Sequence, residues 1–300
     1  MYDCDSTLFG KGRYAVVRPA RRRKTPRESP MGRPQQQNLT NQKPGSLKHS
    51  YSKSDDEFHY PSDGSLEKYD CALKIIDKQL FFDRVQQGKE RIDSIVREAA
   101  VQATITSKSR SNQNLRLQGI FETAKHIVLE LELLDGTDLF KHVSEKEFLD
   151  ETEAAIILKD LLICLNDIQK IGIVHRDVKP ANILMADRKK TGVSVKLADF
   201  GMATFVGLDE LVRGRCGTPG YVAPEILVAG VNTAYGKHVD VFSAGVTLYI
   251  LLCGYEPFYG ENDAKLIKAN KEGKVEFPDD EWSTSKYFHS CVCTFLLWSG

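Results

Sequence analysis

Hydrophobic and polar positions alternate over residues 69–76, which predicts a half-buried strand. Residues 115–121 and 126–134 predict two more strands, and residues 7–17 predict a strand, a glycine turn and a second strand. Apolar residues recur at helical spacing over 92–103, which predicts one amphipathic helix. This part of the chain is therefore expected to be rich in β-structure.

Helical spacing dominates from Asp150 onward. The predicted helices cover residues 151–171, 223–228, 239–253 and 263–272. The third of them is apolar on every side, as expected for a helix buried all round, and its apolar run is too short for a membrane span. Strands first and helices afterwards indicate an α+β molecule with two lobes.

Residues 19–68 interrupt the predicted strands and differ from the rest in composition. They are rich in Arg, Lys, Gln, Ser, Pro and Gly and hold few large apolar side chains. Such a segment cannot bury enough surface to offset its ordering entropy, so we predict a disordered insertion. Its basic run over 21–27 is interpreted as a solvated loop, with a nuclear signal or an anionic docking site as alternatives.

Charge and cysteine content exclude several classes of protein. The chain has 41 Lys and Arg and 41 Asp and Glu, a formal net charge of zero, so its composition favours neither nucleic acid nor a membrane as partner. Apart from Cys291 and Cys293, the seven cysteines are widely scattered, which suits a reducing compartment. The first residues do not resemble a signal peptide. We expect a monomeric cytoplasmic protein, with the nucleus as the alternative location.

The run His175-Arg176-Asp177-Val178-Lys179-Pro180-Ala181-Asn182, followed by Asp199-Phe200-Gly201, carries the strongest chemical signal. It places a carboxylate, a lysine and an asparagine on one loop and a second carboxylate on the next. Phosphoryl transfer requires this equipment: one acid for the attacking hydroxyl, and an Asp and an Asn for magnesium. A solvated polar loop is the alternative, and the order and spacing of the two motifs disfavour it.

Two further motifs fit the same chemistry. Gly10 and Gly12 lie in a variant of the G-x-G-x-x-G motif, with Ala15 in place of the third glycine, where the backbone can approach phosphates closely. A tight hairpin explains these glycines equally well when they are taken alone. Lys74 lies within an apolar strand and needs a buried partner, for which Glu98 on the next helix is the candidate. The alternative for Lys74 is a solubilising charge on an edge strand.

Together these motifs resemble the eukaryotic protein kinases, and most of all the calcium/calmodulin-dependent group. The resemblance covers residues 8–282, apart from the insertion, and implies a bilobal α+β fold. The implied N-lobe, over 1–133, is an antiparallel sheet with one helix. The implied C-lobe, over 134–282, is mainly helical and is expected to be truncated, because residues 283–300 form a divergent tail.

The resemblance also implies roles for individual residues. Asp177 is the catalytic base, Lys179 neutralises the transferring phosphoryl group, and Asn182 and Asp199 hold Mg²⁺. The remaining catalytic residues are Lys74, which binds the α/β-phosphates and pairs with Glu98, and Thr218, which bridges Asp177 and Lys179.

A second set of residues is assigned to the nucleotide by the same resemblance. Leu131 is the gatekeeper, and the backbone of Glu132 and Leu133 meets adenine. Asp138 is placed to meet the ribose or a basic substrate. The other members of the set are Leu8, Gly10 and Gly12 of the glycine motif and the adenine-sandwiching Val17, Ala72 and Leu184.

The implied function is transfer of the γ-phosphoryl group of ATP to serine and threonine hydroxyls of proteins. Lys179 and the segment Gly217–Glu225 are similar to serine/threonine kinases rather than to tyrosine or small-molecule kinases. The alternative is a non-catalytic or unstable truncated kinase fragment that acts as a scaffold. Calmodulin control is not indicated by the sequence.

Two departures concern substrate and activation. Residues 205–217 contain no Ser, Thr or Tyr, although Arg176 resembles the arginine that meets an activation-loop phosphate. We expect activity without phosphorylation there, with Asp209 and Glu210 as possible substitute charges. Ala181 stands where many relatives that prefer basic substrates have an acid. The expectation that the protein substrate carries a basic motif therefore depends on Asp138.

The largest departure lies at the end of the chain. No arginine follows Arg215, although the resemblance pairs Glu225 with an arginine, and an unpaired buried carboxylate costs about 3–5 kcal/mol. Without further kinase helices, one side of the helix over 240–253 is expected to be bare. Either the apolar tail covers that side or the gene product is truncated, and we expected truncation.

Overall fold

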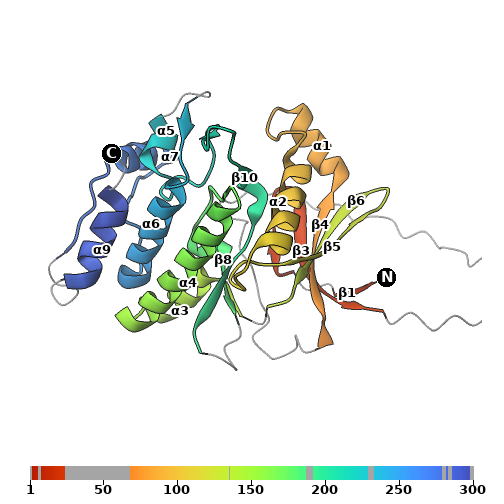
Figure 1. Ribbon diagram of the computed structural model, residues 1–300, viewed down its shortest axis with the longest axis horizontal. Helices are drawn as coiled ribbons and strands as arrows, with labels where there is room; N and C mark the ends of the chain where they lie inside the picture. The colour runs from red at the N-terminus through yellow and green to blue at the C-terminus, as the bar shows by residue number, and fades with distance from the viewer. Residues whose placement is uncertain are drawn as a thin grey trace, which may run out of the picture.

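The computed structural model describes residues 2–5, 8–23, 68–134, 136–186, 192–228, 233–278, 282 and 286–297. Figure 1 shows a β-rich lobe that holds the N-terminus and a larger helical lobe that holds the C-terminus. The expected bilobal α+β architecture is confirmed. Of the predicted insertion, residues 24–67 lie outside the described part of the chain.

The N-lobe is an antiparallel sheet in the order β1-β3-β4-β6-β5, with β2 also paired to β3. The central strand β4 does not show the predicted alternation, because it buries three consecutive residues, 71–73, and β6 likewise buries 129–131. The strands are β1 (Tyr2–Cys4), β2 (Gly10–Lys11), β3 (Ala15–Arg22), β4 (Cys71–Asp77), β5 (Leu117–Glu122) and β6 (His126–Glu132).

The prediction that disorder begins at residue 19 is wrong, because β3 continues to Arg22. Arg18 lies opposite Leu73, and Ala20 lies opposite Cys71 in β4. The basic end of β3 is stabilised by a buried acid, since Arg22 Nε lies 2.6 Å from the Glu130 carboxylate. Tertiary pairing therefore overrides a composition that is typical of disorder.

Two helices cover the N-lobe sheet where one was expected. The expected helix is α2 (Ser94–Lys108), which buries Glu98 and Val101. The additional helix is α1 (Lys78–Gln86), whose first turn is capped by the Asp77 side chain. Its single buried residue, Phe81, gives it little helical periodicity, and for this reason the sequence pattern did not predict it.

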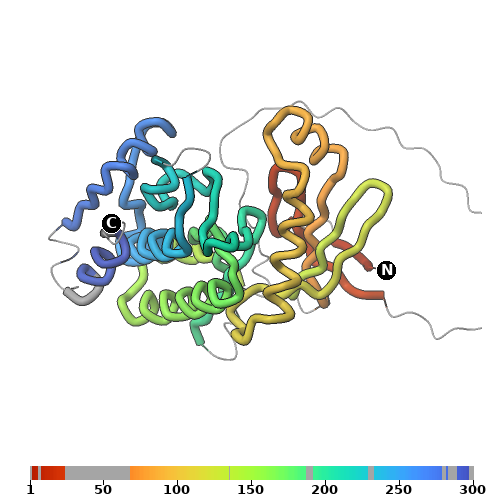
Figure 2. The backbone as a smooth tube through the Cα atoms, turned by 45° about the horizontal axis from the view of Figure 1, so that its top comes forward, coloured from red at the N-terminus to blue at the C-terminus, as the bar shows by residue number. Residues whose placement is uncertain are grey.

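The C-lobe surrounds one apolar helix, α6 (Val239–Cys253). The other helices are α3 (Leu139–Lys146), α4 (Glu151–Lys170), α5 (Pro224–Val228), α7 (Asp263–Glu272) and α9 (Lys286–Leu297). Three two-stranded antiparallel sheets accompany the helices. They pair β8 (Ile183–Ala186) with β9 (Ser194–Leu197), β10 (Thr204–Phe205) with β7 (Ile173–Val174), and β11 (Val212–Arg213) with β12 (Ala234–Tyr235). Figure 2 shows α6 running through the middle of this lobe.

The divergent tail forms α9 and packs against α6. Val292 is fully buried and Leu296 is 6% exposed within the C-lobe core. Gly245 of α6 permits this approach, because a Cβ atom at that position would lie 2.6 Å from the Phe295 Cβ. The expectation that one side of α6 is bare is therefore wrong.

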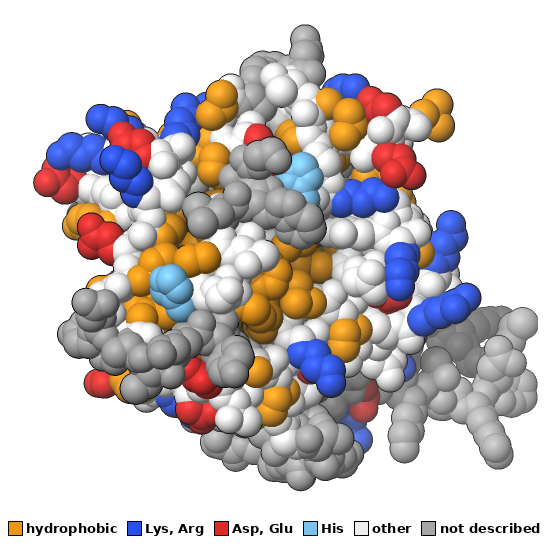
Figure 3. All heavy atoms as spheres, turned by 60° about the vertical axis from the view of Figure 1, so that its left-hand side comes forward, with side chains coloured by type: hydrophobic (Ala, Val, Ile, Leu, Met, Phe, Trp, Pro, Cys, Tyr) orange, Lys and Arg blue, Asp and Glu red, His pale blue; other side chains and the backbone are white. Residues whose placement is uncertain are grey.

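The cover that α9 provides is incomplete. Figure 3 shows hydrophobic side chains gathered in the hollow of this end of the C-lobe. Among described residues of the lobe, Val228 is 71% exposed and Phe277 is only partly buried. The tail thus covers α6 while leaving apolar surface beside it.

We predict that α9 belongs to the cooperatively folded domain. Leu296→Ala removes a buried side chain and should lower the free energy of unfolding by about 2–5 kcal/mol. The matched change Thr294→Ala, at an exposed position of the same helix, should alter it by less than about 0.5 kcal/mol. Urea unfolding measures both values. Equal, small effects would show that α9 is not part of the folded core.

Candidate active site

A cavity of about 410 Å³ lies between the two lobes. Its size is that of an ordinary small-ligand site. The sequence-predicted residues that line it are Gly10, Gly12, Val17, Ala72, Lys74, Glu98, Leu131, Glu132, Leu133, Asp177, Lys179, Asn182, Leu184, Asp199 and Thr218. One cavity therefore collects residues from both lobes that are up to about 200 positions apart in sequence.

Two predicted residues do not line this cavity. Leu8 lies before β2 and is absent from the lining. Asp138 is 4% exposed, and its side chain accepts a hydrogen bond from the backbone N–H of Lys141, so it caps helix α3. Burial raises the pKa of Asp138. The capping role leaves this acid little freedom to contact a basic substrate. The expectation that the substrate carries a basic motif therefore loses its main support.

The apolar end of the cavity has the shape and chemistry of a slot for a flat ring. Ala72 and Leu131 face each other from β4 and β6, and Leu184 comes from the C-lobe hairpin. Leu115 and Ala198 join the same buried cluster, although the sequence analysis had not assigned them. Backbone donors and acceptors in the segment that connects the two lobes would complete such a slot. They come together only when the chain folds, so the spacing of motifs in the sequence does not reveal them.

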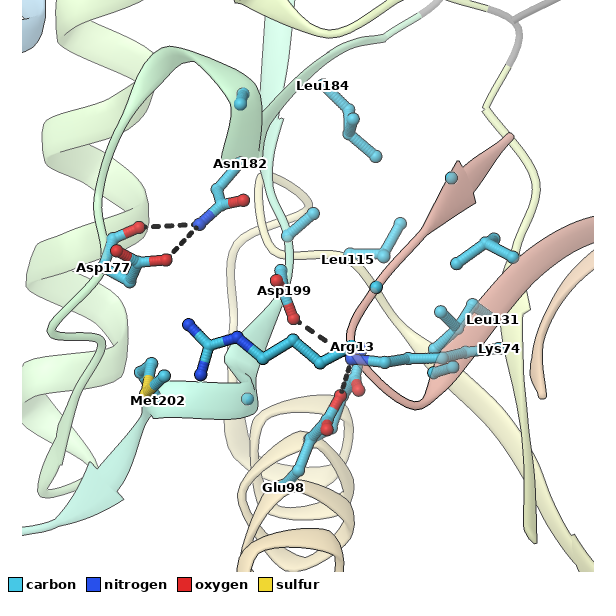
Figure 4. Close-up of a pocket in the computed structure, with 18 of the residues that line it drawn as sticks. Arg13, Lys74, Glu98, Leu115, Leu131, Asp177, Asn182, Leu184, Asp199 and Met202 are labelled. Atoms are coloured by element: carbon cyan, nitrogen blue, oxygen red, sulfur yellow. Dashed lines mark hydrogen bonds and ion pairs between the residues drawn. The ribbon is translucent and has the colours of Figure 1, made fainter. Parts of the chain in front are cut away.

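Lys74 forms the charged centre of the site. Its ammonium lies 2.5 Å from Glu98 Oε1 and 3.1 Å from Asp199 Oδ1 (Figure 4). Burial lowers the pKa of Lys74, but the two carboxylates outweigh burial and raise it above its usual range. The attraction of Lys74 holds the pKa of Asp199 down to about 2, while burial raises that of Glu98. The predicted pairing of Lys74 with Glu98 is present.

Asp177 is held by three partners on the opposite wall of the cavity. The Thr218 hydroxyl donates to Asp177 Oδ1 at 2.6 Å, and Lys179 Nζ lies 3.3 Å from Oδ2. Asn182 Nδ2 donates to Asp177 Oδ2 at 3.0 Å and to its backbone carbonyl at 2.8 Å. Lys179 also donates to Thr218 at 2.9 Å. This network fixes the orientation of the Asp177 carboxylate.

The same hydrogen bonds leave oxygen atoms suited to a hard cation. With its amide nitrogen turned to Asp177, Asn182 keeps its amide oxygen for another partner, as Figure 4 shows. Lys74 engages Asp199 Oδ1 only. Magnesium prefers oxygen ligands and retains several waters, so two protein oxygens fit a nucleotide-bound Mg²⁺ site. No three-residue cluster of His, Cys, Asp or Glu that could hold another metal occurs in the described part of the chain.

The loop that carries Asp177 is anchored from beneath by α6. The fully buried Asp240 carboxylate accepts hydrogen bonds from the backbone N–H groups of His175 and Arg176, each at 2.8 Å. Burial raises the pKa of Asp240, and these bonds oppose that shift. Arg176 has a φ of 67°, an unfavourable conformation for a residue with a side chain, so the loop needs this support.

Arg176 is satisfied without a phosphate. Its Nε donates to the Met202 carbonyl at 2.9 Å, and Nη1 lies 3.2 Å from the Arg213 carbonyl and 3.4 Å from the Tyr235 hydroxyl. The suggestion that Asp209 and Glu210 supply the missing charge is wrong. Asp209 pairs with Arg213, and Glu210 lies 3.9 Å from Lys237.

Comparison with known proteins identifies the family in which this arrangement of side chains occurs. The sequence model of the protein kinase domain family matches residues 66–297. The chain belongs to the protein kinase domain family. The matched range includes α9, beyond the point at which we expected the likeness to stop, and starts after the strands β1 to β3.

Individual relatives indicate which group of protein kinases this chain resembles. A probable myosin light chain kinase of Dictyostelium discoideum is 36% identical over 233 residues, which cover 76% of this chain and 70% of the relative. Myosin light chain kinase A of the same organism is 34% identical over 223 residues, covering 74% and 71%. The type II alpha chain of Drosophila melanogaster calcium/calmodulin-dependent protein kinase is 36% identical over 217 residues, covering 72% and 38%. This kinase is therefore a serine/threonine kinase that resembles the calcium/calmodulin-dependent group.

Glu225 differs from the buried acids of the site. Both of its carboxylate oxygens are buried and form no hydrogen bond with the described residues. His238 Nε2 lies 2.9 Å from Oε1, but this imidazole is 56% exposed and is charged only when protonated. The expected arginine partner is thus replaced by a weaker contact.

We predict opposite outcomes for two acids of this kinase. Asp240→Ala leaves two buried N–H groups unpaired and should lower the free energy of unfolding by about 2–4 kcal/mol and reduce turnover strongly. Glu225→Gln removes a charge whose described contact is the exposed His238 imidazole, and it should change stability by less than about 1 kcal/mol or increase it. Thermal unfolding and steady-state kinetics test both variants. A large loss for Glu225→Gln would reveal a partner for that carboxylate.

Proposed function

We propose that this chain is catalytically active and transfers the γ-phosphoryl group of ATP to serine and threonine hydroxyls of proteins. The proposal rests on one observation above others: Lys74 contacts Glu98 and Asp199 at the same time. That triad joins strand β4, helix α2 and the Asp199 loop in one arrangement. A decayed or collapsed fragment would have no reason to retain it.

Each side chain of the cavity has a distinct role in the proposed reaction. Lys74 orients the nucleotide phosphates, and the oxygens of Asn182 and Asp199 hold Mg²⁺, which supplies charge neutralisation when bound. Asp177 accepts the proton of the substrate hydroxyl. Lys179 faces the transferring group, and Thr218 keeps Asp177 and Lys179 in register. Apolar walls exclude water from the reacting groups.

The activation segment supports activity without phosphorylation. Strand β10 pairs with β7, and β11 pairs with β12, so both ends of the segment are tied to the C-lobe. Arg176 holds its middle through carbonyl groups and Tyr235. Gly217 then passes so close to the catalytic loop that a Cβ there would lie 2.6 Å from the Arg176 carbonyl.

The alternative is a non-catalytic scaffold whose C-lobe is too incomplete to support catalysis. The packing of α9 on α6 favours the active kinase, because α6 anchors the catalytic loop through Asp240. Protein substrates follow from the kinase family. Among the described residues, no helix has both the length and the apolar character required to cross a membrane.

The first test is transfer of radiolabelled phosphate from ATP to a generic protein in the presence of Mg²⁺. We expect incorporation into serine and threonine, identified by phosphoamino-acid analysis. Asp199→Asn should lower the rate by at least about 100-fold, because it removes a metal-holding charge. Equal rates for the two proteins would leave the scaffold as the better account.

The second test concerns activation. Phosphatase treatment should leave the rate unchanged, whereas Tyr235→Phe should lower it roughly two- to tenfold by removing a hydroxyl that joins Arg176 to the Gly214 carbonyl. Tyr259→Phe is the matched control, since Tyr259 is 80% exposed. A phosphatase-treated sample that becomes inactive, with the lost phosphate on the activation segment, would contradict this account.

A further inference from the structure

Arg13 occupies the tip of the glycine hairpin. Strands β2 and β3 are joined through Gly12, whose N–H donates to the Ala15 carbonyl at 2.7 Å, and Arg13 follows within this turn. Figure 4 shows its side chain extended into the cavity, with the guanidinium directed toward the wall that carries Asp177 and Met202. Gly10 and Gly12 before the turn were predicted to bind the nucleotide, whereas no role was predicted for Arg13.

Most cations around the cavity are already engaged. Lys74 pairs with Glu98 and Asp199, and Lys179 pairs with Asp177. Arg97 binds Asp93 at 3.0 Å. Arg13, in contrast, forms no hydrogen bond or ion pair within the described part of the chain, although it lines the same space. Because the carboxylates of Asp177 and Asp199 repel an anionic ligand, such a ligand needs a free cation in the cavity, and Arg13 supplies one.

Lys11, on the same hairpin, also lines the cavity and therefore cannot serve as a control. Lys89 offers a better one, because it is an exposed lysine of the N-lobe that does not line the cavity. Its replacement by alanine removes one positive charge from the chain, as Arg13→Ala does, without altering the nucleotide site.

We propose that the Arg13 guanidinium binds the γ-phosphoryl group of ATP and lets this kinase discriminate ATP from ADP. The inference rests on the proposed function. Lys74, which the proposed function assigns to the nucleotide phosphates, lies on one side of the cavity, and Asp177, which it assigns to the substrate hydroxyl, lies on the other. The terminal phosphoryl group belongs between them, where Arg13 points. A guanidinium stays charged at all working pH values, and its planar donor fork matches phosphate oxygens.

The test is nucleotide binding by the full chain, without a phosphoacceptor. Calorimetry with Mg²⁺ compares ADP with an ATP analogue whose terminal bridge is nitrogen, so that it cannot be hydrolysed. Arg13→Ala should weaken binding of the analogue roughly tenfold and that of ADP less than about twofold. Arg13→Lys, which keeps the charge but loses the fork, should fall between these limits. The control Lys89→Ala should alter both affinities by less than about twofold.

Each other outcome is decisive. Equal weakening of both nucleotides by Arg13→Ala would show that Arg13 only shapes the hairpin, and tighter binding would show that it obstructs the cavity. Either result, or an unchanged affinity ratio, overturns the inference while the proposed function stands. If the unaltered chain binds neither nucleotide, the proposed function falls together with the inference.

Discussion

The ammonium of Lys74 has to be balanced inside an apolar strand, and the active site is organised around that requirement. A buried charge is tolerated only when it is paired and hydrogen-bonded, and removing one partner of a buried pair costs about 3–5 kcal/mol. Glu98 comes from α2 and Asp199 from the C-lobe, so balancing one lysine fixes a helix and a loop at once. The two lobes are thereby set at the separation that leaves the cavity between them.

This arrangement includes backbone conformations that would not persist alone. Asp199 has a φ of 54° and Arg176 a φ of 67°, each of which costs on the order of 1–3 kcal/mol for residues with a Cβ. Lys74 holds the first, and Asp240 with the carbonyl partners of Arg176 holds the second. The strain lies at the residues that would hold Mg²⁺ and position Asp177. The free energy of folding of the surrounding lobes therefore offsets the strain at these residues and keeps the site side chains in position. In this way the packing of α6 supports the geometry of the site.

The sequence specified much of this, and its failures have physical causes. Lys74, Asp177 and Asp199 were predicted because phosphoryl transfer limits both residue type and order along the chain. Helix α1 was missed because a single buried phenylalanine leaves no periodic signal. The capping role of Asp138 was not predicted because capping depends on where a helix begins, and the start of α3 was not predicted. The partners of Arg176 could not be foreseen, since backbone carbonyls carry no signature in the sequence.

The end of the chain shows which structural requirements of the C-lobe are met by helix α9. Burial of an apolar face is non-directional, so a helix of suitable hydrophobicity can cover α6 once Gly245 admits Phe295. An ion pair with Glu225 needs a cation at one place and angle, and among the described residues the contact is the exposed His238, which precedes α6 and is not part of the tail. The tail thus meets the requirement to bury the apolar face of α6. It does not meet the more specific requirement for an ion-pair partner of Glu225. Because Asp240 lies on α6 and Glu225 does not, the requirement that is met is the one on which the catalytic loop depends.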